Sequence, residues 1–215
     1  MEFSVKSGNP EKQRSGCIVI GVFESRKLSA AGKLLDKASG SFLAGVLRRG
    51  DIEGKTGQTL LLHNVPNTLC ERVLLVGCGK ERELDVNTYR KVTATAARTL
   101  NGTGATDAVS YLTDLPLKGR DSYWKVRDCV QTVSDALYVF DQTKSKKHDN
   151  PRALKKLVLS VPSRRELADG EAGARDGRAI AAGMKLTKDL GNLPGNICTP
   201  SYLAEQAKSL KKHAR

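Results

Sequence analysis

The 215-residue chain is 39% hydrophobic and 27% charged, a composition that supports a buried core and excludes a disordered or collagen-like protein. It carries 36 Lys and Arg against 23 Asp and Glu, a net charge of +13 that fits an anionic partner. No stretch approaches the roughly 18 to 20 uninterrupted apolar residues of a membrane span, and the start of the chain lacks a signal-peptide pattern, so we expect a cytoplasmic protein with no membrane partner.

The first half of the chain predicts a strand, two short helices and a hairpin. Residues 17–23 form a short run of apolar, mostly β-branched residues, which is typical of a central strand. Apolar residues then recur every three or four positions over 28–47, interrupted at Gly40, and this predicts two short helices. Apolar runs at 59–63 and 72–77, separated by turn-forming residues, predict two antiparallel strands.

From residue 86 onward, helices and strands alternate. The pattern predicts helices over 86–100 and 122–140, strands over 108–112 and 156–161, and a long helix starting near Arg164. Ser163 and Glu166 have the spacing of a capping box for that helix. Such alternation favours right-handed crossovers and a largely parallel sheet, which the antiparallel hairpin makes mixed. The predicted fold class is therefore α/β, a three-layer mixed sheet flanked by helices.

A turn-rich connector follows the long helix. Residues 189–200 contain two glycines and two prolines and end in Thr199 and Pro200, which fit the N-cap and first position of a new helix. About 13 residues of helix are marginal alone in water. We therefore expect the truncated start of a second domain, in three parts: a domain over 1–162, a linking helix over 163–191, and a connector with a first helix over 192–215.

Side chains that commonly build catalytic or metal sites are scattered along the chain. The five cysteines are odd in number and include no C-x-x-C pair, which argues against a disulfide framework or a zinc knuckle. His63, His148 and His213 are far apart, and none lies in an H-x-x-x-H or C-x-x-H pattern. No G-x-S-x-G motif is present. We therefore predict no metal ligand, no cofactor and no catalytic residue in this chain, and reduced, mostly buried thiols.

A short glycine-containing segment, Gly77-Cys78-Gly79-Lys80, follows an apolar strand and could place backbone amides around a phosphate. It lacks the third glycine of a dinucleotide-binding fingerprint and the G-K-[ST] ending of a P-loop. A tight turn is the better interpretation, and a stand-alone binder of ADP-ribose or a related nucleotide would need a complete phosphate-binding loop.

The positive charge is concentrated in the second half of the chain. Residues 1–117 carry 16 basic and 12 acidic side chains, whereas residues 118–215 carry 20 and 11. Basic residues interleaved with aromatic ones can follow a nucleic-acid backbone, although lysines in loops also simply solvate a surface. The candidate DNA-contacting residues are Lys118, Arg120, Lys125, Arg127, Lys144, Lys146, Lys147, Arg152, Lys155 and Lys156.

Several segments spread over residues 1–210 together resemble one enzyme family. They are residues 1–8, 47–50, 77–85, 123–127 and 188–192. The most specific segment is Asn192-Leu193-Pro194-Gly195-Asn196, which is similar to an N-x-P-x-N connector that leads into a catalytic domain. On these residues the chain is identified as a member of the bacterial leucyl aminopeptidase family. Gly195 stands where Pro is expected, a change that would loosen the connector.

The resemblance implies a macro-domain-like N-terminal domain, a linking helix, and then a catalytic domain with two divalent metal ions, Mn or Zn. In the family, the metal ligands and catalytic residues lie in a K-G-x-x-x-D-x-G-G and an N-T-D-A-E-G-R segment, and neither pattern occurs in these 215 residues. The resemblance therefore implies the non-catalytic N-terminal part of a cytosolic metalloaminopeptidase, inactive alone, whose parent removes N-terminal residues, preferably leucine, from peptides.

The family also implies a homo-hexamer. Its enterobacterial aminopeptidase A branch further implies an accessory DNA-binding role in site-specific recombination and transcriptional control. The alternative interpretation is therefore a DNA-contacting module that uses the basic residues named above, and a stand-alone nucleotide binder is the third hypothesis.

Overall fold

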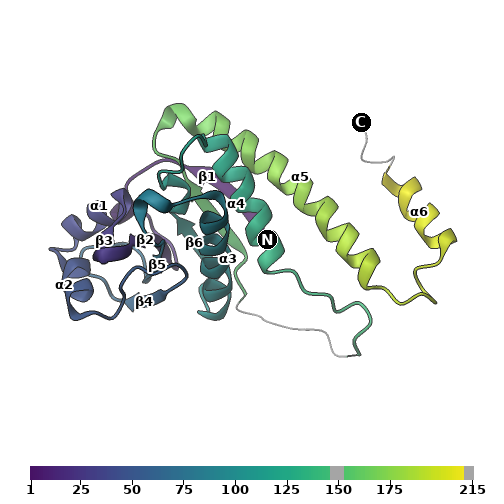
Figure 1. The fold of residues 1–215 in the computed structure, drawn as a ribbon, viewed down its shortest axis with the longest axis horizontal. Coiled ribbons are helices and arrows are strands. Elements are labelled where there is room, and N and C mark those ends of the chain that lie inside the picture. The colour runs from purple at the N-terminus through teal and green to yellow at the C-terminus, as the bar shows by residue number, and fades with distance from the viewer. Residues whose placement is uncertain (146–152, 211–215) are drawn as a thin grey trace.

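The computed structural model describes residues 1–145 and 153–210, and its centre is a seven-stranded mixed sheet (Figure 1). The strands are β1 (Glu2–Lys6), β2 (Ile18–Phe23), β3 (Lys27–Leu28), β4 (Thr59–His63), β5 (Arg72–Gly77), β6 (Asp107–Ser110) and β7 (Lys156–Ser160). Their order is β1-β7-β6-β2-β5-β4, with β3 beside β2. Neighbouring strands are parallel except that β4 is antiparallel to β5 and β3 to β2, which confirms the predicted mixed α/β sheet.

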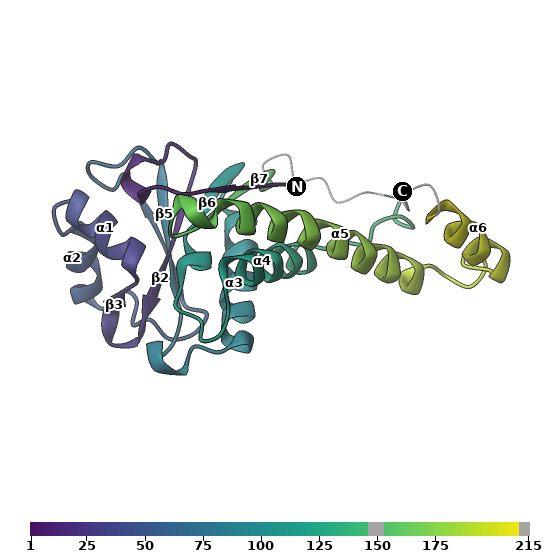
Figure 2. The ribbon, with the colours of Figure 1, turned by 90° about the horizontal axis from the view of Figure 1, so that it is seen from above.

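Helices cover both faces of the sheet. They are α1 (Ala30–Ala38), α2 (Phe42–Arg49), α3 (Val86–Gly102), α4 (Ser122–Ala136), α5 (Leu167–Asn192) and α6 (Pro200–Leu210). Helices α1 and α2 lie on one face, and α3, α4 and α5 on the other (Figure 2). Because side chains alternate along a strand, Ile18 and Ile20 of β2 pack toward α1 and α2, whereas Val19 packs in the core beneath α3 and α4.

The edge strand β1 is the main element that the sequence did not predict. It pairs in parallel with β7, from Glu2 opposite Lys156 to Lys6 opposite Ser160. Only Phe3 of β1 is buried, so the strand lacks the continuous apolar run that marks the central strands. Its partner comes from the far end of the domain, and a local pattern does not reveal such a pairing.

Three glycines let the backbones of α4 and α5 approach each other closely. Gly170, Gly173 and Gly177 are buried on the face of α5 that meets α4 and the sheet. A Cβ atom at Gly173 would lie 2.4 Å from the carbonyl oxygen of Tyr123, and one at Gly177 would lie 2.9 Å from that of Arg127. The first half of α5 is therefore fixed by backbone-to-backbone packing.

The second half of α5 leaves the body of the domain. No residue from 178 to 192 is buried, and this half extends beyond the α/β layers while α6 stands apart from them (Figure 2). The helix start at Pro200 is confirmed, because the amide of Tyr202 donates to the Thr199 hydroxyl at 3.3 Å.

Two boundary predictions were wrong. The Ser163 hydroxyl donates to the Glu166 carboxylate at 3.0 Å instead of capping the helix backbone, residues 164–166 form a 3₁₀ turn, and α5 begins only at Leu167. Helix α4 ends at Ala136 instead of residue 140. There Tyr138 leaves the helix and its hydroxyl donates to Asp189 of α5 at 2.9 Å, a tertiary contact that overrides the local helical pattern.

Candidate functional site

The basic residues proposed to contact DNA do not form one continuous surface. Lys118 and Arg120 are exposed in the loop before α4, at the carboxyl ends of the parallel strands. Lys144, Lys155 and Lys156 are exposed beyond the other end of α4, whose 15 residues span about 22 Å. Three more candidates lie outside the described residues: Lys146, Lys147 and Arg152.

Two of the predicted cations stack on aromatic rings of α4. The guanidinium of Arg120 lies 4.6 Å from the centre of the Trp124 ring, and that of Arg127 lies 5.5 Å from the centre of the Tyr123 ring. The Tyr123 hydroxyl donates to Asp176 of α5 at 3.0 Å. One face of each ring is therefore already occupied by a cation of the same chain. These contacts stabilise the start of α4 and its packing against α5.

Lys125 is buried, with 7% of its surface exposed, and cannot contact a nucleic acid. Its Nζ donates to the carbonyl oxygen of Leu115 at 3.3 Å and is attracted by the carboxylates of Asp114, Glu166 and Asp121. Burial lowers the pKa of Lys125, because the charged ammonium loses solvation. The interleaved basic and aromatic pattern of 118–127 therefore has a structural cause at this position.

Lys125 belongs to a polar group that we call the root cluster, because it lies at the start of α5. Its members are the buried residues Ser122, Lys125 and Ser160 and the half-buried residues Asp114 and Glu166. Asp114 Oδ2 accepts from the Ser160 hydroxyl at 3.0 Å, whereas its Oδ1 is buried and has no hydrogen-bond partner. Glu166 accepts from the Ser122 hydroxyl. Burial raises the pKa of Asp114 to about 6. No local sequence motif predicts this cluster, because its members come from four separate segments of the chain.

The turn at Gly77 to Lys80 does not form a phosphate site. The amide of Gly77 donates to Gln58, that of Cys78 to Val22 and that of Gly79 to Gly54, each to a backbone carbonyl oxygen at 2.7 to 2.8 Å. A Cβ at Gly77 would lie 2.0 Å from the carbonyl oxygen of Lys55. The glycines therefore serve close chain packing, and no amide of residues 77–79 is left for an anion, which argues against a nucleotide binder.

Four of the five thiols, those of Cys17, Cys70, Cys78 and Cys129, are buried. Burial raises the pKa of Cys17, Cys78 and Cys129 to about 12, so none carries the thiolate needed for catalysis. Cys198 is half-buried.

The described residues also do not fit the two-metal centre that the family resemblance implies. Residues 1–145 and 153–210 contain no group of three or more His, Cys, Asp or Glu side chains that could hold a metal ion. His63 is exposed at the end of β4, and the other two histidines lie outside the described residues. Among the described helices, none has the length and apolar character to cross a membrane.

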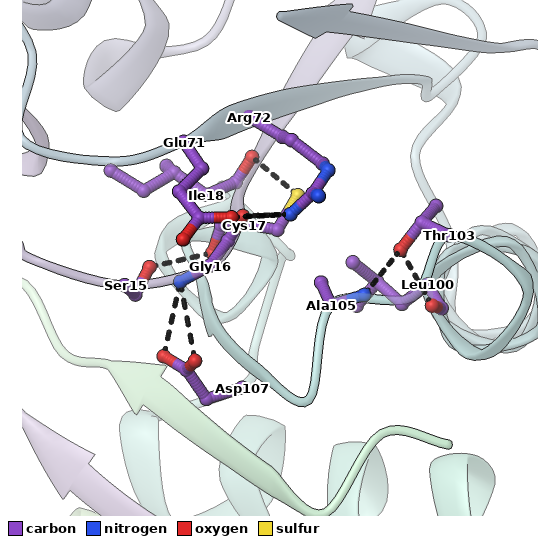
Figure 3. A network of polar contacts seen from close by, with 10 residues as sticks. All are labelled: Ser15, Gly16, Cys17, Ile18, Glu71, Arg72, Leu100, Thr103, Ala105 and Asp107. Carbon is purple, nitrogen blue, oxygen red and sulfur yellow. Dashed lines mark hydrogen bonds and ion pairs between the residues drawn. The ribbon is translucent and has the colours of Figure 1, made fainter. Parts of the chain in front are cut away.

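A second polar network lies at the amino ends of β2, β5 and β6 (Figure 3). The amide of Gly16 donates to both carboxylate oxygens of Asp107, at 3.3 and 3.2 Å. Arg72 Nη1 donates to the carbonyl oxygen of Gly16 at 3.3 Å and to Glu71 at 2.8 Å. Because the network serves the backbone at Gly16, its role is to fix where these strands begin.

A groove of about 740 Å³ runs between the end of α4, the second half of α5 and β1. Its lining includes the side chains of Phe3, Leu137, Tyr138 and Met184 and the charged side chain of Arg178. Apolar side chains are also exposed along α5 and beyond: Ile180, Met184, Ile197, Leu203 and Leu210. The described residues therefore leave uncovered the apolar surface of the second half of α5 and of α6.

Comparison with known proteins identifies the family of this chain. The sequence profile of the cytosol aminopeptidase family, N-terminal domain, matches residues 19–147. The chain belongs to this family. It is 64% identical over 212 residues to a probable cytosol aminopeptidase of Thioalkalivibrio sulfidiphilus, a match that covers 99% of this chain and 43% of the relative. The chain therefore spans less than half the length of that relative.

Solved structures share the fold at low sequence identity. A tomato leucine aminopeptidase mutant matches with a TM-score of 0.73 at 19% identity, over 99% of this chain and 42% of that one. The bottromycin maturation enzyme BotP in complex with Mn matches with a TM-score of 0.67 at 20% identity, over 93% and 37%. The predicted family and N-terminal-domain fold are confirmed, whereas no comparison supports the DNA-contacting alternative.

Proposed function

We propose that this chain is the non-catalytic N-terminal portion of a cytosolic leucyl metalloaminopeptidase, which removes N-terminal residues, preferably leucine, from peptides. The observation that carries the proposal is the 64% identity to a probable cytosol aminopeptidase over 99% of the chain. The proposed parts are a domain over 1–162, a linking helix over 163–191 and the start of the catalytic part over 192–215. The proposed assembly is a homo-hexamer.

Two divalent metal ions, Mn or Zn, would act in the remainder of the longer polypeptide. The described residues of this chain offer no ligand cluster for them, so we assign no step of the reaction to its side chains. BotP, which shares the fold, forms a complex with Mn, and this supports manganese as one of the metals of the longer protein.

The proposed role of α5 and α6 is to join the α/β domain to the catalytic part. The first half of α5 is fixed to α4 by close packing at Gly173 and Gly177. Its second half carries the exposed apolar residues Ile180 and Met184, and α6 carries Leu203. Burial of such side chains against a further domain is favourable, at about 25 cal/mol per Å² of apolar surface.

Hydrolysis of leucine p-nitroanilide with added Mn²⁺ tests the proposal. We expect no turnover by the purified 215-residue chain and clear turnover by the longer Thioalkalivibrio sulfidiphilus relative under the same conditions. Turnover by the 215-residue chain would contradict its non-catalytic role. A lack of turnover by the longer relative would contradict the aminopeptidase assignment itself.

A further inference from the structure

The root cluster lies where the start of the linking helix packs on the sheet at Gly170, close to Val5 and Val161, and four segments contribute to the cluster. Asp114 lies in the 3₁₀ turn after β6, and Ser160 is the last residue of β7. Ser122 and Lys125 belong to the first turns of α4, and Glu166 immediately precedes α5. Hydrogen bonds from Ser160 to Asp114 and from Ser122 to Glu166 join these segments in pairs.

The electrostatic balance of the cluster is unfavourable when every carboxyl group is ionised. Three carboxylates, those of Asp114, Glu166 and Asp121, surround the single ammonium of Lys125. Lys125 has three donors and, within residues 1–145 and 153–210, makes one hydrogen bond, to Leu115. Asp114 Oδ1 is buried and has no donor among the residues that the structure describes. Burial of the Asp114 carboxylate favours its protonated form most strongly, and the nearby negative charge of Glu166 acts in the same direction. The hydrogen bond from Ser160 and the charge of Lys125 act in the opposite direction but are outweighed.

We propose that the root cluster is a pH-sensitive latch, in which protonation of Asp114 tightens the hold of the first turns of α5 on the sheet and its ionisation loosens it. Protonation removes the electrostatic repulsion between Asp114 and Glu166. The ammonium of Lys125 then interacts with the carboxylate of Glu166 without competition from Asp114. Glu166 then keeps its hydrogen bonds from Ser122 and Ser163. The latch is independent of the aminopeptidase proposal, because it uses only residues of this chain.

The direction of the pH effect follows from the sign of the shift. The pKa of Asp114 is raised from 3.8 to about 6, so the stabilisation is fully present below pH 3.8 and is lost as the pH rises through about 6. The other titratable groups that face Asp114 are Lys125, Glu166, Tyr89 and Tyr111. Burial raises the pKa of both tyrosines and lowers that of Lys125. No histidine faces the cluster among the described residues.

Hydrogen exchange of the 215-residue chain, followed by mass spectrometry between pH 5 and pH 8 and corrected for the intrinsic exchange rate, tests the latch. We expect protection of the first two turns of α5 to fall by about 10-fold across this range, because the part of the loss between pH 3.8 and pH 5 lies below it. Asp114→Asn removes the titrating group and is expected to make this protection independent of pH. Asp51→Asn, at an exposed aspartate on the other side of the sheet, is expected to keep the wild-type pH dependence.

Two results would overturn the latch. One is the same fall in protection in Asp114→Asn as in the wild type, and the other is a wild type whose protection does not change with pH. Carboxyl-carbon NMR titration of Asp114 in the unmodified chain needs no variant. A midpoint near 6 supports the latch, whereas a midpoint near the ordinary value of about 4 overturns it.

Discussion

Gly173→Ala is expected to lower the free energy of unfolding by about 3 kcal/mol, the upper end of the usual cost of overpacking a close contact. A Cβ at this position would lie 2.4 Å from the carbonyl oxygen of Tyr123 and 3.2 Å from the amide nitrogen of Arg127. Both atoms are backbone, so no side-chain rotation relieves the contact and α5 has to move away from α4. Urea denaturation followed by circular dichroism measures the change.

Gly183→Ala, ten residues further along the same helix, is the matched control. No atom lies within 4 Å of a Cβ built at Gly183, so the same substitution adds helix propensity without a collision. We expect it to raise stability by roughly 0.5 to 1 kcal/mol. Equal effects of the two substitutions would show that helix propensity alone acts on α5 and that the close seam with α4 does not.

The sequence predicts best where a local pattern decides the structure. The antiparallel pairing of β4 with β5 follows from two apolar runs separated by a turn, and its register places Leu60 opposite Leu75. The central strand β2 is buried along its whole length, so its continuous apolar run identifies it. Edge strand β1 has one buried residue and a partner about 150 positions away, and its local sequence carries no comparable signal.

The candidate surface is predicted less well, because charge alone does not say which side a residue faces. The sequence places Lys125 in a run of basic residues, yet the period of α4 turns it inward toward Asp114 and Glu166. Lys118 lies just before the start of α4, whereas Lys156 begins β7 near the end of α4. The distance between the two lysines therefore depends on the direction in which α4 runs across the sheet. Such placements require the tertiary fold, whereas the family resemblance needs only short segments of sequence.

Arg90→Ala is expected to lower the free energy of unfolding by about 2 kcal/mol, because it removes the half-exposed cation that pairs with a buried carboxylate and leaves that carboxylate uncompensated. Asp128 of α4 is 3% exposed, and Arg90 of α3 holds its carboxylate with two nitrogens: Nη2 donates to Oδ1 at 2.6 Å and Nε to Oδ1 at 2.9 Å. The carboxylate of Asp128 would then remain between two helices without its cation. Urea denaturation at pH 7 measures the loss.

Arg98→Ala provides the matched control on the same helix. Arg98 is exposed two turns beyond Arg90, beside the same groove between α3 and α4, and makes no ion pair with any residue in 1–145 or 153–210. Its removal is expected to change stability by no more than about 0.5 kcal/mol. Because the penalty comes from the stranded Asp128 carboxylate, the double variant Arg90→Met with Asp128→Leu should regain most of the lost stability. A double variant as unstable as Arg90→Ala would show instead that the stranded carboxylate of Asp128 is not the cause of the loss.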